Sequence, residues 1–278
     1  MKKTKKGLRT VGVYLLYIAV ILIFLVPIYW VIITSFKQPE DMFAYPPEWF
    51  VENGTLDHYK QVLFQTLMPL AFRNSLIISA TTVIIAGVLS VLAAYGFSRY
   101  RFKANQPLMV LLLITKMLPA SVLIVPLYVM MNNMRLLDTF PGIIAVYVSI
   151  NIPFSVWIMK SFYDSIPKEL DEAAVIDGCS TFGTFTKILL PLTRPGIVAT
   201  SVITFFTCWN EFTIALILTS SSKVQPMSIA LYTFMTEQGV QWGPITCAAS
   251  IAIFIPAVLF IIFQKSFISG MTSGAVKG

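Results

Sequence analysis

The sequence predicts an all-α membrane protein with six transmembrane helices and both termini in the cytoplasm. Three observations support this fold class. First, 56% of the residues are hydrophobic and only 12% are charged, whereas a soluble domain carries about 25% charged residues. Second, the chain holds six long apolar segments. Third, its basic residues gather on alternate connections between those segments. This composition excludes an ordinary soluble enzyme, a disordered chain and a disulfide scaffold.

Each apolar segment is long enough to cross a bilayer core, which needs roughly 20 residues of helix. The predicted spans are residues 11–36, 70–98, 107–131, 141–162, 196–219 and 245–263. Because the core offers no water to backbone groups, these spans should be helical. The first run is 26 residues long, longer than the apolar region of a signal peptide, and no A-x-A site follows it. We therefore expect it to be a retained span.

The distribution of basic residues predicts the orientation. Fourteen Lys and Arg residues lie on the tails and connections of one side, and five lie on the other. The positive-inside rule places the first group in the cytoplasm and the 37–69 connection outside. The net charge of +7 is thus interpreted as a topology signal, and no nucleic-acid partner is expected.

These assignments divide the chain into three parts. Residues 1–69 hold a cytoplasmic tail, the first span and an extracytoplasmic loop. Residues 70–264 form a five-helix core that includes a cytoplasmic loop at 165–191. Residues 265–278 form a cytoplasmic tail.

The residues that usually carry catalysis or bind metals are scarce. His58 is the only histidine, which argues against a His-rich metal site or a Ser-His-Asp triad, and we expect it to be a solvated loop residue. The chain has no Gly-Lys dipeptide and hence no Walker A loop. Its three cysteines form no CxxC pattern. We therefore predict a non-catalytic chain with no metal and no cofactor of its own.

The loop at 165–191 has the pattern of a helical hairpin. Pro167 suits the first turn of a helix, and Glu169, Asp171 and Glu172 lie near its positive end. Gly178 is a natural C-terminal cap because it adopts positive φ without strain.

A second short helix is predicted after this turn. Phe182, Phe185 and Leu189 form an apolar stripe, and Pro191 should end the helix. From the residues alone, the hairpin is equally well read as a docking surface for a partner or as a helix on the bilayer surface.

The spacing within this loop resembles the EAA motif of the membrane subunits of binding-protein-dependent ABC importers. The match comprises Glu172-Ala173-Ala174, then Gly178, then Ile188-Leu189-Leu190-Pro191. Residues 119–128, 152–154, 209–212 and 274–278 and the Asp177-Gly178 pair are similar to the MalG-like branch of carbohydrate importers.

The resemblance implies the MetI-like fold of a type I ABC importer permease in a bacterial or archaeal cytoplasmic membrane. It implies a second, different permease, two ATPase subunits that hold ATP and magnesium, and an extracytoplasmic sugar-binding protein. The imported solute would be a sugar or a sugar-like molecule. The expected ATPase-coupling residues are Glu172, Ala173, Ala174, Asp177, Gly178 and Pro191.

Ionisable groups at membrane depth are a second source of candidates. Lys116, Asn210 and Glu211 could line the translocation path or the permease interface, or the two charges could merely satisfy each other or backbone carbonyls. Two other classes stay open on the residues alone. A secondary transporter would favour repeated halves and several intramembrane carboxylates, and an intramembrane enzyme needs a nucleophile and a base.

Overall fold

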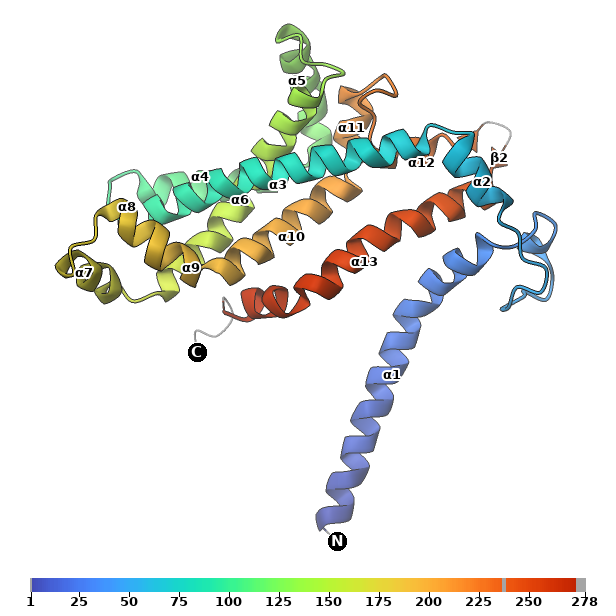
Figure 1. Cartoon of the computed structure of the whole chain (residues 1–278), viewed down its shortest axis with the longest axis horizontal. Coiled ribbons are helices and arrows are strands. Elements are labelled where there is room, and N and C mark those ends of the chain that lie inside the picture. The colour runs from blue at the N-terminus through green and yellow to red at the C-terminus, as the bar shows by residue number, and fades with distance from the viewer. Residues whose placement is uncertain (1, 237–238, 274–278) are drawn as a thin grey trace. The chain divides into compact units, whose positions relative to one another are not determined.

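The computed structural model describes residues 2–236 and 239–273, and this part of the chain is built almost entirely from helices (Figure 1). Residues 274–278, which carry part of the family resemblance and the end of the predicted tail, lie outside the described residues. The helices in chain order are α1 (Lys2–Thr34), η1 (Asp41–Phe43), α2 (Asp57–Phe64), α3 (Met68–Arg99), α4 (Asn105–Met117), α5 (Ala120–Asn133), α6 (Phe140–Ser165), α7 (Glu169–Ile176), α8 (Thr181–Thr184), η2 (Phe185–Leu189), α9 (Leu190–Leu192), α10 (Arg194–Asn210), α11 (Thr213–Leu218), α12 (Met227–Tyr232) and α13 (Trp242–Ser273).

The chain divides into two compact units. Unit 1 comprises residues 1–69 and 231–254, and unit 2 comprises residues 70–230 and 255–278. Strands β1 (Met235–Thr236) and β2 (Gly239–Val240) form an antiparallel pair in unit 1, with Met235 opposite Val240.

In the described part of the chain, four helices are long and apolar enough to cross a membrane. They are Gly12–Thr34 within α1, Met68–Arg99, Phe140–Ser165, and Trp242–Lys265 within α13. Two bent helix pairs bring the number to as many as six if each pair is one span. The predicted all-α, multi-spanning fold class is thus confirmed, but two of the predicted spans are not continuous helices.

The predicted span 107–131 is broken at its centre. Helices α4 and α5 meet at a bend of 103°, and Leu118 and Pro119 between them have extended ψ values of 124° and 137°. The cause is local, because the ring of a proline disfavours the helical conformation of the residue before it.

The predicted span 196–219 is also wrong in its extent. Helix α10 ends at Asn210, Glu211 is extended with ψ 125°, and the short α11 follows. At its other end, α10 continues the segment Thr181–Leu192 through a bend of 70°. Buried Thr193 lies at this bend and donates its hydroxyl to the carbonyl of Leu189 at 3.1 Å.

The loop at 165–191 is a helical hairpin, as its sequence pattern predicts. Its first arm is α7, and its second arm is formed by α8, the π-helical segment η2 and α9. Gly178 between the arms has φ +83°, the left-handed conformation expected of a glycine cap. The second arm ends at Leu192, one residue beyond Pro191, because a proline is tolerated in the first turn of the new α-helical stretch.

In unit 1, a buried lysine organises the 37–69 connection. Lys37 is 1% exposed, donates to the carbonyl oxygen of Glu48 at 2.6 Å and lies 4.6 Å from the ring centre of Trp30. Its carbonyl is 3.1 Å from the Nε2 of His58, whose ring packs against Gly243. The prediction of a solvated His58 is therefore wrong, since this histidine is buried.

In unit 2, Asp138 links two turns. Its carboxylate accepts hydrogen bonds from the backbone N–H groups of Ser220 and Ser221, both at 2.9 Å, and its own N–H donates to Leu218 at 2.8 Å. Partial burial acts to raise the pKa of Asp138, but the hydrogen bonds from the two serines outweigh it and leave the pKa below its ordinary value.

The expected orientation can be tested by labelling single cysteines with an impermeant maleimide, after Cys179, Cys208 and Cys247 are replaced by serine. Asn53 is exposed whereas Thr55 in the same loop is buried, so the probe belongs at Asn53. We expect Asn53→Cys to react from outside intact cells. Ser180→Cys on the hairpin should react only after the membrane is permeabilised. The reverse pattern would contradict the orientation predicted from charge.

Candidate functional site

Unit 2 contains a cavity of about 430 Å³ where its two helix breaks come together. Helices α4, α5, α6, α10 and α11 supply its wall, which is mostly apolar. The residues that line it are Thr115, Lys116, Leu118, Leu123, Leu127, Met130, Met131, Ala145, Val146, Tyr147, Ser149, Ile150, Asn151, Pro153, Thr207, Cys208, Glu211 and Ile214. A few polar groups in an apolar pocket are the usual composition of a small-molecule site.

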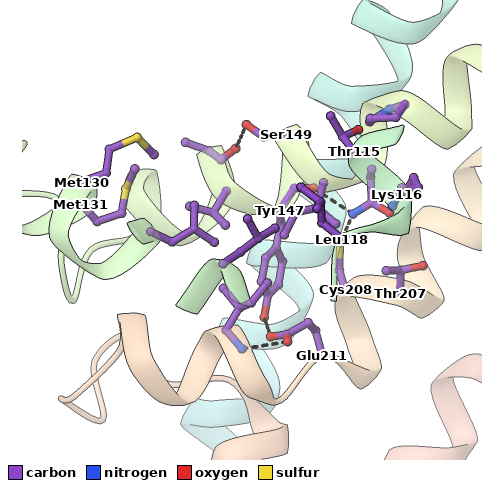
Figure 2. Close-up of a pocket in the computed structure, with 18 residues that line it drawn as sticks. Thr115, Lys116, Leu118, Met130, Met131, Tyr147, Ser149, Thr207, Cys208 and Glu211 are labelled. Carbon is purple, nitrogen blue, oxygen red and sulfur yellow. Dashed lines mark hydrogen bonds between the residues drawn. The ribbon is translucent and has the colours of Figure 1, made fainter. Parts of the chain in front are cut away.

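The Glu211 carboxylate holds the break between α10 and α11 together. One of its oxygens accepts the hydroxyl of Tyr147 at 2.7 Å and the N–H of Ala215 at 3.0 Å. The other accepts the N–H of Ile214 at 2.8 Å. Figure 2 shows the Tyr147 hydroxyl pointing at this carboxylate. Because the first N–H groups of a helix have no partners within the helix, a carboxylate at this position both caps α11 and complements its dipole.

The hydroxyl of Ser228 strengthens the same break by donating to the carbonyl oxygen of Glu211 at 2.7 Å. The sequence singled out Glu211 as an ionisable group at membrane depth, but it did not identify Tyr147. An apolar span with one tyrosine carries no signal for such a contact, because the partner lies 64 positions away.

Lys116 and Glu211 line the same pocket but do not neutralise each other. The described part of the chain contains three ion pairs, and neither residue takes part in them. Figure 2 shows the two side chains at separate places on the wall. The alternative in which the two charges satisfy each other is therefore wrong, because the Glu211 carboxylate already has three donors within the chain.

Asn210, the third predicted residue of the membrane site, does not line the pocket. Its side chain is exposed and donates to the carbonyl of Phe206 in its own helix at 3.0 Å. Asn151 of α6, which the sequence did not single out, does line the pocket. Its amide donates to the carbonyl of Tyr147 at 2.8 Å.

The hairpin is a second candidate surface, and it lies at one end of unit 2 (Figure 1). Of the predicted coupling residues, Glu172, Ala173, Asp177, Gly178 and Pro191 are exposed, whereas Ala174 is buried. The exposed residues of α7 and α8 also include large apolar side chains, namely Leu170, Val175, Ile176 and Phe182. Several exposed large apolar side chains on one short hairpin are typical of a contact with another protein or with lipid.

No group of three or more His, Cys, Asp or Glu side chains in the described residues could hold a metal ion. The geometry provides a mostly apolar pocket with a few polar groups at two helix breaks and an exposed hairpin, and α10 joins the two. These features suit conduction of a solute and docking of a partner.

Removing the Glu211 carboxylate should destabilise the break. We expect Glu211→Ala to lower the free energy of unfolding by about 2 kcal/mol or more, since it leaves the Tyr147 hydroxyl and two backbone N–H groups unpaired. Tyr147→Phe should cost less, about 1 kcal/mol, because the two helix N–H groups keep their acceptor. Asn210→Ala is the matched control and should change stability by less than about 0.5 kcal/mol. Thermal unfolding in detergent measures all three, and equal losses in all three variants would contradict the capping role.

The absence of an ion pair between Lys116 and Glu211 has a separate consequence. The effects of Lys116→Gln and Glu211→Gln on stability should add to within about 0.5 kcal/mol in the double variant. A double variant markedly more stable than that sum would show that the two charges do interact. The same unfolding measurement in detergent decides between the two outcomes.

Comparison with known proteins agrees with this geometry. Residues 86–273 match the family described as the inner membrane component of binding-protein-dependent transport systems. The trehalose/maltose transport system permease MalG of Thermococcus litoralis is 32% identical, covering 99% of this chain and 98% of its own. The diacetylchitobiose uptake system permease DasC of Streptomyces coelicolor is 30% identical, covering 91% of both chains.

The fold is also that of a solved transporter. A chain of a bacterial ABC transporter involved in the import of the polysaccharide alginate superposes with a TM-score of 0.81 at 19% identity, covering 95% of this chain and 98% of that one. The predicted importer fold and the resemblance to the MalG-like branch are thus confirmed. The alternatives of a secondary transporter and of an intramembrane enzyme are excluded. The chain belongs to the family of inner membrane components of binding-protein-dependent transport systems, and it is a multi-pass, non-catalytic permease subunit of an ABC importer.

Proposed function

We propose that this chain is one of two different permease subunits of a sugar importer and that its 165–191 hairpin is the surface on which an ATPase subunit docks. The observation that carries the proposal is the continuity of the second hairpin arm with α10. One end of α10 joins the exposed hairpin, and the other end reaches the pocket through Thr207 and Cys208 and leads into Glu211.

The hairpin has the properties of a docking surface. Its exposed side chains combine apolar residues with the carboxylate of Glu172. Gly178 lies at the turn, and a Cβ added there would meet no other atom of the chain within 4 Å. The surface at this glycine is therefore open to a closely approaching partner, and Ala173 beside Glu172 is small enough to permit such an approach.

Motion of the hairpin can reach the pocket through a rigid element. The apolar cluster around Phe185 and Leu189 anchors the second arm to α3 and α6, and the bend at Thr193 is buried. A displacement of this arm would therefore be passed to α10 rather than absorbed by a loose loop. The 430 Å³ pocket with Lys116 and Glu211 on its wall is our candidate for part of the solute path or of the contact with the second permease.

Because the hairpin docks an ATPase subunit and the pocket is a candidate for the solute path, the importer needs further subunits as partners. The ATPase subunits supply ATP and magnesium, and a binding protein delivers the solute on the extracytoplasmic side. Both chain termini and the hairpin lie in the cytoplasm. The solute is a sugar, which the trehalose/maltose and diacetylchitobiose systems of two full-length relatives support.

The docking role of Gly178 can be tested by Gly178→Asp. A side chain in the left-handed conformation costs on the order of 1 kcal/mol, which is small for a helical bundle whose spans do not depend on this turn. We expect membrane insertion and pairing with the second permease to persist. Attachment of the ATPase, or uptake per ATP hydrolysed, should fall by about 10-fold or more. Co-purification and uptake in reconstituted vesicles with the binding protein provide the measurements.

Glu172→Lys should act in the same direction if a basic ATPase residue meets this exposed carboxylate. Asn53→Asp is a suitable control, because it adds a carboxylate at an exposed position of the 37–69 loop, which the predicted topology places on the opposite side of the membrane. Wild-type ATPase attachment and uptake in Gly178→Asp would mean that the hairpin is not the docking surface.

A further inference from the structure

Arg99, the last residue of α3, ties the ends of two spans to the first arm of the hairpin. Its side chain is 7% exposed, and its Nε lies 2.7 Å from the Oδ2 of Asp171 in α7. Its two terminal nitrogens donate to the carbonyl oxygens of Tyr163 at 2.9 Å and Ile166 at 3.1 Å. The two terminal nitrogens are therefore hydrogen-bonded to the end of α6, whereas Nε meets the Asp171 carboxylate as an ion pair without the geometry of a hydrogen bond.

The contact with Tyr163 and Ile166 completes the end of α6. The last carbonyls of a helix lack partners within the helix, and a cation there complements the negative end of the helix dipole. The neighbouring Ser98 reinforces the same junction by donating to the Oδ1 of Asp164 at 2.6 Å. The ends of α3 and α6 are therefore joined by charge-assisted hydrogen bonds, which are the stronger kind.

The two arms of the hairpin are held in different ways. The second arm is held by apolar packing, since Phe185 and Leu189 are buried and the ring of Phe185 lies 4.9 Å from that of Tyr95 in α3. The first arm has a single buried residue, Ala174. Among the described residues, the Arg99–Asp171 pair is the one side-chain ion pair or hydrogen bond that joins α7 to the spans.

The three carboxylates at the start of α7 consequently differ in what they face. Glu169 and Glu172 are exposed, whereas Asp171 turns inward to Arg99 with its side chain 23% exposed. A guanidinium group is suited to this position because its planar fork presents donors in fixed directions to several acceptors at once. An ammonium group offers no such fork.

We propose that Arg99 and Asp171 form an electrostatic latch that makes α7 move as one body with the ends of α3 and α6. The inference rests on the proposed docking role of the hairpin and adds the residues that position it. With the latch closed, a partner that displaces α7 displaces the two spans. With the latch open, α7 turns on its own about Gly178 and Ile166, and the spans stay in place.

The latch can be tested on the permease in lipid nanodiscs with its three native cysteines replaced. Spin labels at Val175→Cys in α7 and Ser161→Cys in α6, both exposed positions, report the distance between the two helices. We expect Asp171→Asn to broaden the distance distribution about two-fold, since α7 loses its one polar tie. Arg99→Gln should do the same, and the double variant should be no broader than either single variant.

Conservative replacements separate the latch from a general loss of structure. Asp171→Glu keeps the carboxylate and should keep the narrow distribution, whereas Arg99→Lys keeps the charge but loses the fork and should not. Glu169→Gln neutralises an exposed carboxylate in the same helix and should change nothing. An unchanged distribution in Asp171→Asn, or broadening by Glu169→Gln of the same size, would overturn the proposal.

A second experiment measures the same distance in the assembled importer with and without ATP and vanadate. The distance between α7 and α6 should stay the same between the two states in the wild type and should change in Asp171→Asn, because only an intact latch carries α6 along. A wild-type distance that changes between the states would refute the latch. The measurement in the permease without ATPase subunits does not depend on docking, so failure of the latch and failure of the docking surface at Gly178 give different results.

Discussion

Every backbone polar group in a membrane span needs a partner within the protein, and the structure of this permease depends on how its two helix breaks meet that requirement. Hydrocarbon offers no water to an exposed N–H or C=O group, so irregular backbone at membrane depth is tolerated where it lines a cavity or is buried in protein. The breaks at Pro119 and Glu211 obey this rule, because residues at both breaks line the same 430 Å³ pocket. At the second break, the Glu211 carboxylate supplies the acceptor that two N–H groups of α11 would otherwise lack.

Two charged residues of unit 2, Glu211 and Arg99, follow from the same constraint. Glu211 takes backbone N–H groups as donors, and Arg99 gives its donors to backbone carbonyls at the end of α6. Each charge is thus placed where a helix ends and leaves groups unpaired. Lys116, in the last turn of α4, also lies on the pocket wall, but unlike Glu211 it makes no side-chain hydrogen bond or ion pair within the described part of the chain. This difference makes Lys116 a candidate for contact with something outside the chain, whereas Glu211 is first of all structural.

The hairpin and the pocket are connected by covalent continuity as well as by packing. The second hairpin arm runs into α10 through a buried bend, and α10 ends at the pocket. The first arm is held to the spans by a polar tie. One arm of the hairpin is thus packed into the core, whereas the other buries only Ala174 and meets the spans through the Arg99–Asp171 ion pair. This asymmetry would let a partner on the hairpin act on several spans at once, which is the physical basis of the proposed coupling.

The sequence by itself determined the membrane character, the main spans and the hairpin, because these depend on local properties. Apolar length decides whether a segment can cross a bilayer, and a left-handed turn at Gly178 is a preference of that residue alone. The family resemblance was likewise carried by short motifs with fixed spacing. The two broken spans were only partly predictable: Pro119 gave a local signal, but the break at Glu211 has no proline. Only the tertiary structure decided that Tyr147 contacts Glu211 and that Lys116 forms no ion pair with Glu211. It also decided that Asp171 turns inward to Arg99. These contacts join positions more than 60 residues apart, and whether two such side chains meet depends on how the helices pack, which no local pattern encodes.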